Sequence, residues 1–385
     1  MSDQASYAGI HPSRELFPMT DSNHTFVVDQ NDLDNCATLE LPHTGADQLA
    51  DGEALLTVDH FAFTANNITY AALGKRFKYW DFFPVEAPWG QIPVWGFADV
   101  TASRHPEIKT GTRVYGYLPM ANQLIVKPGK VSKSSFLDTA EHRQHLALAY
   151  NQYLFTAADP AYRPEHEALQ MLLRPLLITS FLLDDFLATQ DFFGADQIIL
   201  TSASSKTALG LAFMLQHQRQ ARGKQLTITA LTSPGNTAFV ESLGYYDKVV
   251  SYADIGKLDA TQGTVSVDFA GNGEVLADLH KHFADNMLFS SLVGAAHWDA
   301  RGGDKNMPGA KPEVFFAPGY WEKRGKEVGN AELMQNFAKL WAPLVTSVES
   351  WMKVTELKGQ ESMRQAYLDT LHGDIRPDQG LILKP

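Results

Sequence analysis

The sequence of 385 residues contains a single cysteine, Cys36. One cysteine excludes an internal disulfide framework and a multi-cysteine zinc site, and it fits a reducing compartment. Basic residues are also scarce, with 32 against 44 acidic ones and a formal net charge of −12. Because no dense Lys/Arg cluster is present, the chain lacks the positive field that nucleic acid and anionic membrane require. We therefore expect neither as a partner.

Long hydrophobic runs are absent as well. The most apolar segment, residues 172–187, is interrupted by Arg174, Pro175, Asp184 and Asp185. It falls short of the roughly 18 to 20 apolar residues that a membrane span requires, so a buried helix is the better interpretation. The first twenty residues lack a basic segment followed by an apolar core. We expect no secretory signal and a cytoplasmic protein.

The first third of the chain is punctuated by glycine and proline, with short β-rich runs between. These runs cover residues 25–28, 54–63, 92–100, 113–120 and 123–129. Several short strands separated by turn signals predict an antiparallel barrel or sandwich. Apolar residues at three- and four-residue spacing then predict helices over 142–155 and 165–194, the second kinked or broken at Pro175.

Strand and helix patterns alternate after residue 195. We predict strands near 197–200, 226–231, 248–252, 264–270, 286–294 and 313–317, and helices near 205–222, 236–243 and 274–284. This alternation indicates βαβ units and a parallel sheet covered on both faces, so the fold class is α/β. The tail from 331 to 372 is predicted to be helical, with a last strand in residues 379–385.

A candidate phosphate turn follows the first of these strands, in QIILTSASSKTALGLA (197–212). Small residues recur every third position, at Ser202, Ser205 and Ala208, and can replace glycine if the turn avoids positive φ. The helix N-terminus would present N–H groups to an anion. Further hydroxyl donors and one positive charge come from Ser204, Thr207 and Lys206. Two alternatives remain: an ordinary corner with serine N-caps, or an ATP loop, which lacks both of its glycines.

Seven stretches follow one another along the chain: DGEALLTVDHFAFTANNITYAALG, PVWGFADV, GTRVYGY, SASSKTA, LTSPGNTAFVESLGYYDKVVSY, VDFAGN and SLVGAA. In this order they resemble the medium-chain dehydrogenase/reductase superfamily, in its zinc-independent, quinone-oxidoreductase-like branch. The resemblance implies a GroES-like β-rich domain (1–155), a Rossmann-type nucleotide domain (156–325) and a C-terminal return to the first domain (326–385). It also implies a dinucleotide cofactor, a small organic substrate and a homodimer.

The resemblance assigns roles to individual residues. Tyr70 stands at the aspartate position of the family's G-x-N-x-x-D segment, with Asn67 on its asparagine. Ser202, Ser205 and Ala208 fall on the three marked positions of the phosphate turn. Tyr252 falls near the tyrosine that lies along the adenosine ribose. Phe269, Ala270 and Gly271 fall in the turn on the nicotinamide side. Two turn glycines are missing, and no Gly-His-Glu segment exists, so we expect no catalytic zinc.

The end of the second parallel strand bears on the choice of dinucleotide. An NAD site usually has Asp or Glu there, whereas this chain has Thr232, Ser233, Pro234, Gly235 and Asn236. Without an acid, a 2′-phosphate is not repelled, and Ser233 and Asn236 could donate to it. In the resembled family, the position of Asn236 often holds a phosphate-binding lysine. NADPH is therefore favoured over NADH, although a ligand-free Pro-Gly turn would explain the same residues.

Tyr70 is the first candidate for the proton donor, because a phenol with a pKa near ~10 suits donation to an enolate or alkoxide. Asn67 could orient it or hold the carbonyl, and Tyr79 and Tyr117 are alternatives. The aromatic run at 77–83 could wall a substrate pocket or fill the core. We predict a zinc-free NADP(H)-dependent oxidoreductase acting on a carbonyl or activated alkene. The alternatives are a non-catalytic dinucleotide-binding or scaffold protein and an ATP-binding protein.

Overall fold

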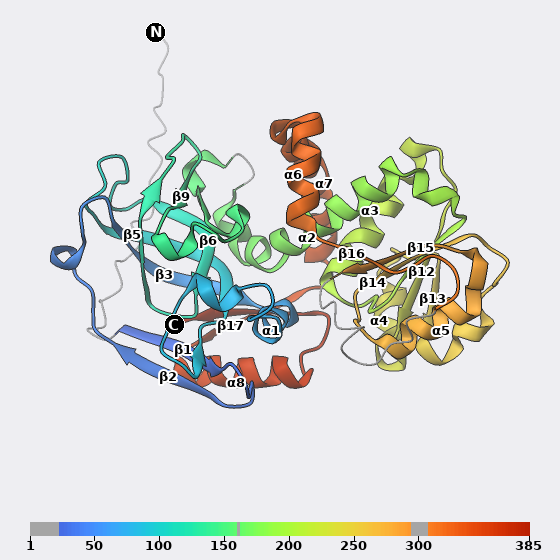
Figure 1. Cartoon of the computed structure of the whole chain (residues 1–385), viewed down its shortest axis with the longest axis horizontal. Helices are drawn as coiled ribbons and strands as arrows, with labels where there is room; N and C mark the ends of the chain where they lie inside the picture. The colour runs from blue at the N-terminus through green and yellow to red at the C-terminus, as the bar shows by residue number, and fades with distance from the viewer. Residues whose placement is uncertain (1–22, 160–161, 294–306) are drawn as a thin grey trace, which may run out of the picture.

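The computed structural model describes residues 23–159, 162–293 and 307–385. A β-rich half and a half built on a parallel sheet lie side by side, with helices α2, α6 and α7 between them (Figure 1). The chain passes from the first half to the second through α2 and returns at its C-terminal end. No described helix has both the length and the apolar character needed to cross a membrane.

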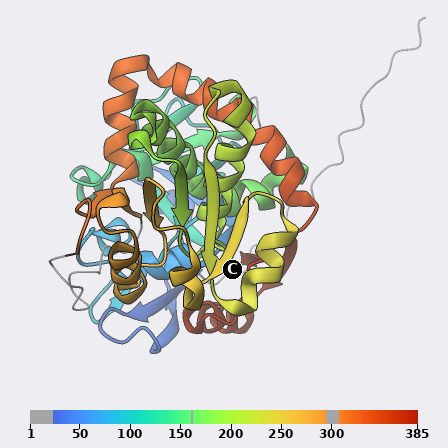
Figure 2. The ribbon, with the colours of Figure 1, turned by 90° about the vertical axis from the view of Figure 1, so that its right-hand side faces the viewer.

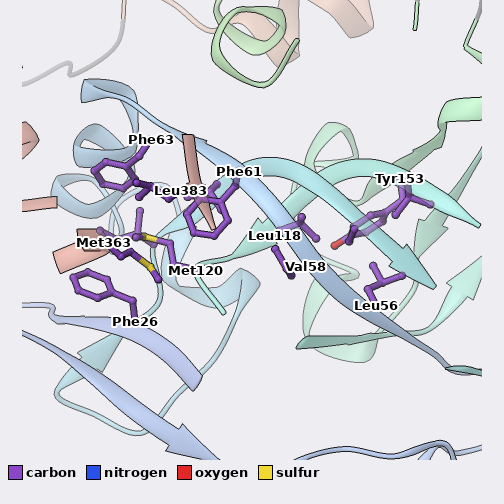
Figure 3. Packing of buried hydrophobic residues seen from close by; sticks show 14 of the residues in the cluster. Phe26, Leu56, Val58, Phe61, Phe63, Leu118, Met120, Tyr153, Met363 and Leu383 are labelled. Carbon is purple, nitrogen blue, oxygen red and sulfur yellow. The ribbon is translucent and has the colours of Figure 1, made fainter. Parts of the chain in front are cut away.

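The β-rich half contains a nine-stranded sheet in the order β17-β18-β3-β5-β6-β10-β9-β8, with β7 paired to β3, and a small sheet β2-β1-β4. Its central strands are antiparallel, as predicted. The bounds are β1 Asn23–Asp29, β2 Cys36–Leu41, β3 Ala54–Phe63, β4 Trp89–Gly90, β5 Pro93–Ser103, β6 Arg113–Pro119, β7 Gln123–Val126, β8 Pro128–Gly129, β9 Ser135–Asp138 and β10 Gln152–Phe155. Phe26, Phe61, Phe63 and Leu118 lie in its core (Figure 3). Helix α1 (Ala65–Ala72) follows β3.

The second half is a six-stranded parallel sheet in the order β13-β12-β11-β14-β15-β16, seen with its helices in Figure 2. Its strands are β11 Gln197–Leu200, β12 Thr227–Thr232, β13 Lys248–Ser251, β14 Thr264–Asp268, β15 Met287–Val293 and β16 Glu313–Phe315. The helices of this half are α3 Lys206–Arg222, α4 Thr237–Ser242 and α5 Gly273–Phe283. Central strands β11 and β14 are buried throughout, as expected for a sheet covered on both faces. The predicted α/β class with a parallel sheet is confirmed.

One prediction at the junction is wrong. Residues 142–155 form short 3-10 turns and then strand β10, because Leu154 pairs with Tyr115 and Ser135 and sheet pairing overrides the helical spacing. Helix α2 (Glu167–Thr189) continues through Pro175 and is not broken there.

The C-terminal part joins the β-rich half. Helices α6 (Ala317–Val328) and α7 (Asn330–Glu349) are followed by β17 (Lys353–Lys358), which interrupts the predicted helical tail, and by α8 (Gln360–His372). The last strand, β18 (Gln379–Lys384), pairs parallel to β17 and antiparallel to β3. The C-terminus therefore lies in the β-rich half (Figure 1). The domain limits 1–155, 156–325 and 326–385 stay a prediction.

Candidate functional site at the carboxyl edge of the parallel sheet

Ser202, in the turn after β11, has a left-handed backbone conformation. Ser202 has φ +46°, so the turn does not meet the condition, a backbone without positive φ, under which small residues replace glycine easily. Its N–H donates to Tyr252 Oη at 2.9 Å, and its carbonyl accepts from the Ser205 N–H at 2.8 Å. These two hydrogen bonds hold a conformation that costs a non-glycine residue about 1–2 kcal/mol. The turn therefore has a backbone conformation that usually requires glycine, and the hydrogen bonds with Tyr252 and Ser205 stabilise it.

Helix α3 begins directly after this turn. Ser205 is its N-cap and accepts from the Ala208 N–H at 3.4 Å, while the Thr207 carbonyl accepts from Ser180 Oγ at 2.7 Å. The glycine that comes late in the motif, Gly210, permits close packing on α2: a Cβ there would lie 2.4 Å from Leu177 Cδ2. The positive end of the α3 dipole and the hydroxyl groups of the turn face the sheet edge where an anion would bind.

The end of β12 meets the same turn. Asn236 Nδ2 donates to Ser204 Oγ at 3.0 Å, which joins the second strand to the phosphate turn. Ser233 precedes a short turn at Pro234–Asn236, and Thr232 is buried. A Cβ at Gly235 would meet no atom within 4 Å, so this turn faces open space. The structure brings Ser202, Ser204, Ser205, Ser233, Asn236 and Tyr252 to one edge of the sheet.

At the end of β14, a buried acid organises the predicted nicotinamide-side turn. Asp268 accepts from Thr201 Oγ1 and from the N–H groups of Ala270 and Gly271, both at 3.1 Å. The Phe269 N–H donates to Thr201 Oγ1 at 3.0 Å. Burial raises the pKa of Asp268, and these donors act in the opposite direction. Asp268 is the acid of the VDFAGN stretch, whereas Thr201 was not predicted as its partner, although it is the polar residue directly after a buried strand.

Lys206 lies at a different place from the hydroxyl groups. Its ammonium donates to the carbonyl of Gln379 at 2.9 Å, and burial among apolar side chains lowers its pKa to about 8. Because Leu381 pairs with Phe63 in antiparallel β18 and β3, Gln379 lies near the end of β3, where α1 begins. Lys206 therefore connects the phosphate turn to β18, the strand that pairs with β3. Its predicted role toward a phosphate stays a prediction.

The two residues predicted for catalysis differ in their surroundings. Asn67 forms the capping box of α1: its Oδ1 accepts from the Thr64 N–H at 2.8 Å, and its Nδ2 donates to the Pro93 carbonyl at 2.9 Å. Both ends of its amide are thus engaged within the protein. Tyr70 is 5% exposed and packs against Tyr79 and Tyr117, with ring centroids 4.6 and 5.7 Å away. Burial raises its pKa.

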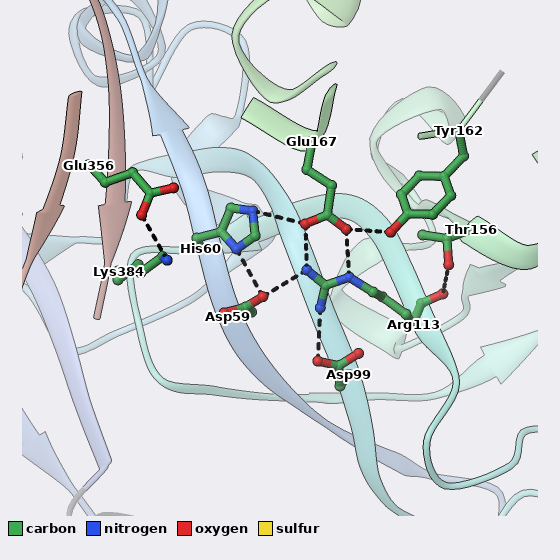
Figure 4. A network of polar contacts seen from close by, with 9 residues as sticks. All are labelled: Asp59, His60, Asp99, Arg113, Thr156, Tyr162, Glu167, Glu356 and Lys384. Carbon is green, nitrogen blue, oxygen red and sulfur yellow. Dashed lines mark hydrogen bonds and ion pairs between the residues drawn. The ribbon is translucent and has the colours of Figure 1, made fainter. Parts of the chain in front are cut away.

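A separate network of charges ties β3, β5 and β6 to the start of α2 (Figure 4). Arg113 pairs with Asp59, Asp99 and Glu167 at 2.7–2.8 Å, and His60 lies between Asp59 (2.9 Å) and Glu167 (3.2 Å). Burial raises the pKa of Glu167, but hydrogen bonds from His60 and Arg113 outweigh it and lower the pKa to about 2. Burial likewise opposes protonation of His60, yet its two carboxylate partners raise its pKa.

Asp59, His60 and Glu167 also form the one group of His, Cys, Asp and Glu side chains with metal-binding spacing among the described residues. The carboxylates of Asp59 and Glu167 accept hydrogen bonds from Arg113, and the two ring nitrogens of His60 face these same carboxylates. A cation there would have to displace the guanidinium. The donor set therefore fits an ion-pair network, and the predicted absence of catalytic zinc stays a prediction.

A cavity of about 490 Å³ lies on the outer side of the turn at Tyr79–Phe82. Trp80 and Trp89 form its apolar walls, and its polar groups bond to neighbours within the protein. These polar groups are Gln30, Lys75, Asp81, His142 and His145. The aromatic residues of the run at 77–83 therefore lie in two places. Trp80 lines this cavity, whereas Phe82 packs in a buried cluster with Tyr70.

Comparison with known proteins agrees with this architecture. The family described as "Protein of unknown function (DUF2855)" matches residues 61–376. The chain belongs to this family. No curated protein matches the sequence.

Among solved structures, CurA from Vibrio vulnificus in complex with NADPH is similar at 13% identity and a TM-score of 0.60, covering 94% of this chain and 98% of that one. The yhdH oxidoreductase from Salmonella enterica in complex with NADP is similar at 13% identity and a TM-score of 0.51, covering 94% and 99%. A mutant form of the enoyl thioester reductase from Candida tropicalis is similar at 11% identity and a TM-score of 0.53, covering 94% of this chain and 100% of that one. The fold is that of the medium-chain dehydrogenase/reductase superfamily, a Rossmann-type domain with a GroES-like domain, as predicted.

Proposed function

We propose that this protein is a zinc-free NADP(H)-dependent oxidoreductase that reduces a carbonyl or an activated alkene of a small organic molecule. The observation that carries the proposal is the gathering of Ser202, Ser204, Asn236 and Tyr252 at the carboxyl edge of the parallel sheet. Ligands of open α/β sheets bind at this edge. The similar solved structures from Vibrio vulnificus and Salmonella enterica hold NADPH and NADP.

The residues at this edge fit a phosphorylated dinucleotide. Hydroxyl and amide donors surround the start of α3. Asp268, at the end of β14, is buried and engaged by Thr201 and two backbone N–H groups. At the end of β12, Asn236 and Ser233 stand where an NAD site has an acid, which supports NADP(H) over NAD(H). Tyr252 lies across the turn and would border the adenosine.

The bound nicotinamide would supply the hydride. The chain's own part is to orient the substrate and to deliver a proton. Tyr70 is the candidate because its helix follows β3, and β18, the partner strand of β3, accepts the Lys206 bond from the nucleotide turn. Burial keeps Tyr70 protonated at neutral pH. A neutral phenol is the form that can donate to an oxygen on which charge develops.

The test is oxidation of NADPH by wild type and Tyr70→Phe with 9,10-phenanthrenequinone, 2-cyclohexen-1-one and benzaldehyde as acceptors, before and after chelation with EDTA. We expect turnover that EDTA leaves unchanged and that Tyr70→Phe lowers about 100-fold, with unchanged affinity for NADPH. NADPH binding without turnover, and without hydride exchange between NADPH and added NADP analogue, would favour the non-catalytic dinucleotide-binding protein.

A further inference from the structure

Four tyrosines and a tryptophan form a cluster beside α1, which we call the tyrosine cluster: Tyr70, Tyr79, Trp95, Tyr117 and Tyr150. Their rings are in contact, with centroids 4.7 Å apart for Tyr117 and Tyr150 and 5.0 Å for Trp95 and Tyr117. Five polar groups are thus brought into a region whose other members are Phe82, Phe83, Leu124 and Leu146. Core packing alone would be served as well by phenylalanine.

Two hydrogen-bond donors of this cluster have no partner among the described residues. They are Trp95 Nε1 and Tyr117 Oη, and both are buried. The two residues stand directly opposite each other on β5 and β6, so their side chains share one face of the sheet. An indole N–H can only donate, and a buried donor left unpaired costs about 1–3 kcal/mol. Buried polar groups rarely lack a hydrogen-bond partner, so we infer that a bound ligand supplies the acceptor for these two donors.

Tyr70 lies where such an acceptor would be held. Burial raises the pKa of Tyr70, whereas Trp95, Asn66 and Tyr117 lie close enough to act in the opposite direction as donors. Neither Trp95 Nε1 nor Tyr117 Oη completes a hydrogen bond with it. The proposed proton donor and the two unpaired donors therefore converge on one point.

One positive group, paired with an acid, lies beside the tyrosine cluster. The Arg143 guanidinium is 1% exposed, lies 4.7 Å from the centre of the Phe83 ring and pairs with Asp138 at 3.2 Å. Burial and the neighbouring Tyr70, Tyr150 and Tyr79 raise the pKa of Tyr117, and Arg143 acts against this increase. A positive charge held in a low-dielectric region stabilises charge that develops nearby.

Three members of the cluster are partly exposed, and the segment before Tyr79 contacts the other half of the molecule. Tyr79, Trp95 and Tyr150 are half-buried, whereas Tyr70 and Tyr117 are buried. Phe77, two residues before Tyr79, stacks on Phe316 with centroids 6.5 Å apart and an interplanar angle of 6°. Phe316 follows β16 at the carboxyl edge of the parallel sheet. The segment before Tyr79 therefore lies next to the end of β16, the outermost strand of the parallel sheet.

We propose that Trp95 Nε1–H and Tyr117 Oη–H bind the carbonyl oxygen of the substrate, and that the surrounding rings select a flat, aromatic or conjugated carbonyl compound. This inference rests on the proposed function. As hydride adds to the carbonyl carbon or to the conjugated alkene carbon, the π pair of the carbonyl moves onto its oxygen. The two donors hold this charge, and Tyr70 gives its proton to complete the alcohol or enol. Solvent then reprotonates Tyr70 from the half-buried side.

The variants Trp95→Phe and Tyr117→Phe remove one donor each and keep a ring. We expect each to lower kcat with 9,10-phenanthrenequinone about 100-fold, with a smaller change in KM. Because the donors are unpaired in the free protein, neither variant should lower the unfolding temperature. The matched control is Trp351→Phe, since Trp351 Nε1 donates to Tyr245 Oη at 3.2 Å far from this cluster; it should keep kcat. Unchanged kcat in both donor variants, or a loss equal to that of the control, would overturn the assignment.

A second measurement needs no cofactor and so separates this inference from the proposed function. The probe is p-nitrophenol, whose phenolate resembles an enolate and absorbs visible light. Wild type should bind the phenolate, and each donor variant should weaken binding about tenfold, whether or not NADPH binds. Equal binding by wild type and both variants, or no binding by wild type, refutes the donor pair. Failure of NADPH to bind refutes the proposed function alone.

Discussion

Replacing Ser202 with glycine is the most direct perturbation of the phosphate turn. Ser202 has φ +46°, a conformation that costs a residue with a Cβ about 1–2 kcal/mol. Glycine removes this cost but loses about 0.5–1 kcal/mol of backbone entropy on folding. Since the N–H bond to Tyr252 and the carbonyl bond to Ser205 involve only backbone atoms of residue 202, both are kept. Ser202→Gly should therefore stabilise the protein by about 0.5–1 kcal/mol.

The assay is urea unfolding of wild type, Ser202→Gly and Ser202→Ala, with the slope of the transition compared to ensure that the unfolded states match. Alanine keeps the Cβ and hence the cost, so Ser202→Ala should change the free energy of unfolding by less than about 0.5 kcal/mol. A glycine variant less stable than wild type by about 1 kcal/mol, or an alanine variant as stabilised as the glycine one, would refute the claim that this serine is strained.

Three further predictions concern other parts of the molecule. Glu167→Gln should cost about 3 kcal/mol at pH 5.5, measured by urea unfolding. In wild type, the Glu167 contribution is present above pH 4.5 and is lost as pH falls toward 2. The His60 contribution is present below pH 6.5 and is lost as pH rises through its higher folded pKa. Stability should thus peak between these limits, and the surface control Glu327→Gln should cost under about 0.5 kcal/mol. Gly210→Ala should destabilise by about 1–2 kcal/mol despite its better helix propensity, because its Cβ would overlap Leu177; a stabilised variant would contradict this packing. Asn236→Asp should weaken NADPH binding at least about tenfold and favour NADH, and an unchanged ratio of the two affinities would count against the assigned 2′-phosphate position.

Much of the fold follows from local patterns in the sequence. The strands around 197–200, 227–232 and 264–268 are short apolar runs between turn residues, and their parallel pairing follows from the helices between them. Strand β10 could not be predicted in this way, because its helical spacing is overridden by pairing of Leu154 with β6 and β9. Strand β17 likewise depends on pairing with β18 at the end of the chain.

The candidate site was predictable only in part. The serines after β11 and the acid-free end of β12 are visible in the sequence because they sit at strand ends, and the structure joins them through Ser204 and Asn236. The bond from Asn67 to the Pro93 carbonyl and the bond from Lys206 to Gln379 span 26 and 173 residues, and no local pattern encodes them. The unpaired donors on Trp95 and Tyr117 depend on the register of β5 and β6.

The central claim, a dinucleotide site at the carboxyl edge of the parallel sheet, is tested most directly by fluorescence titration with NADPH, NADH and ATP. Wild type should bind NADPH at micromolar concentration with enhanced, blue-shifted emission, bind NADH more weakly and not bind ATP. Absence of binding by either dinucleotide at millimolar concentration would contradict the account and leave a medium-chain reductase fold without a nucleotide site.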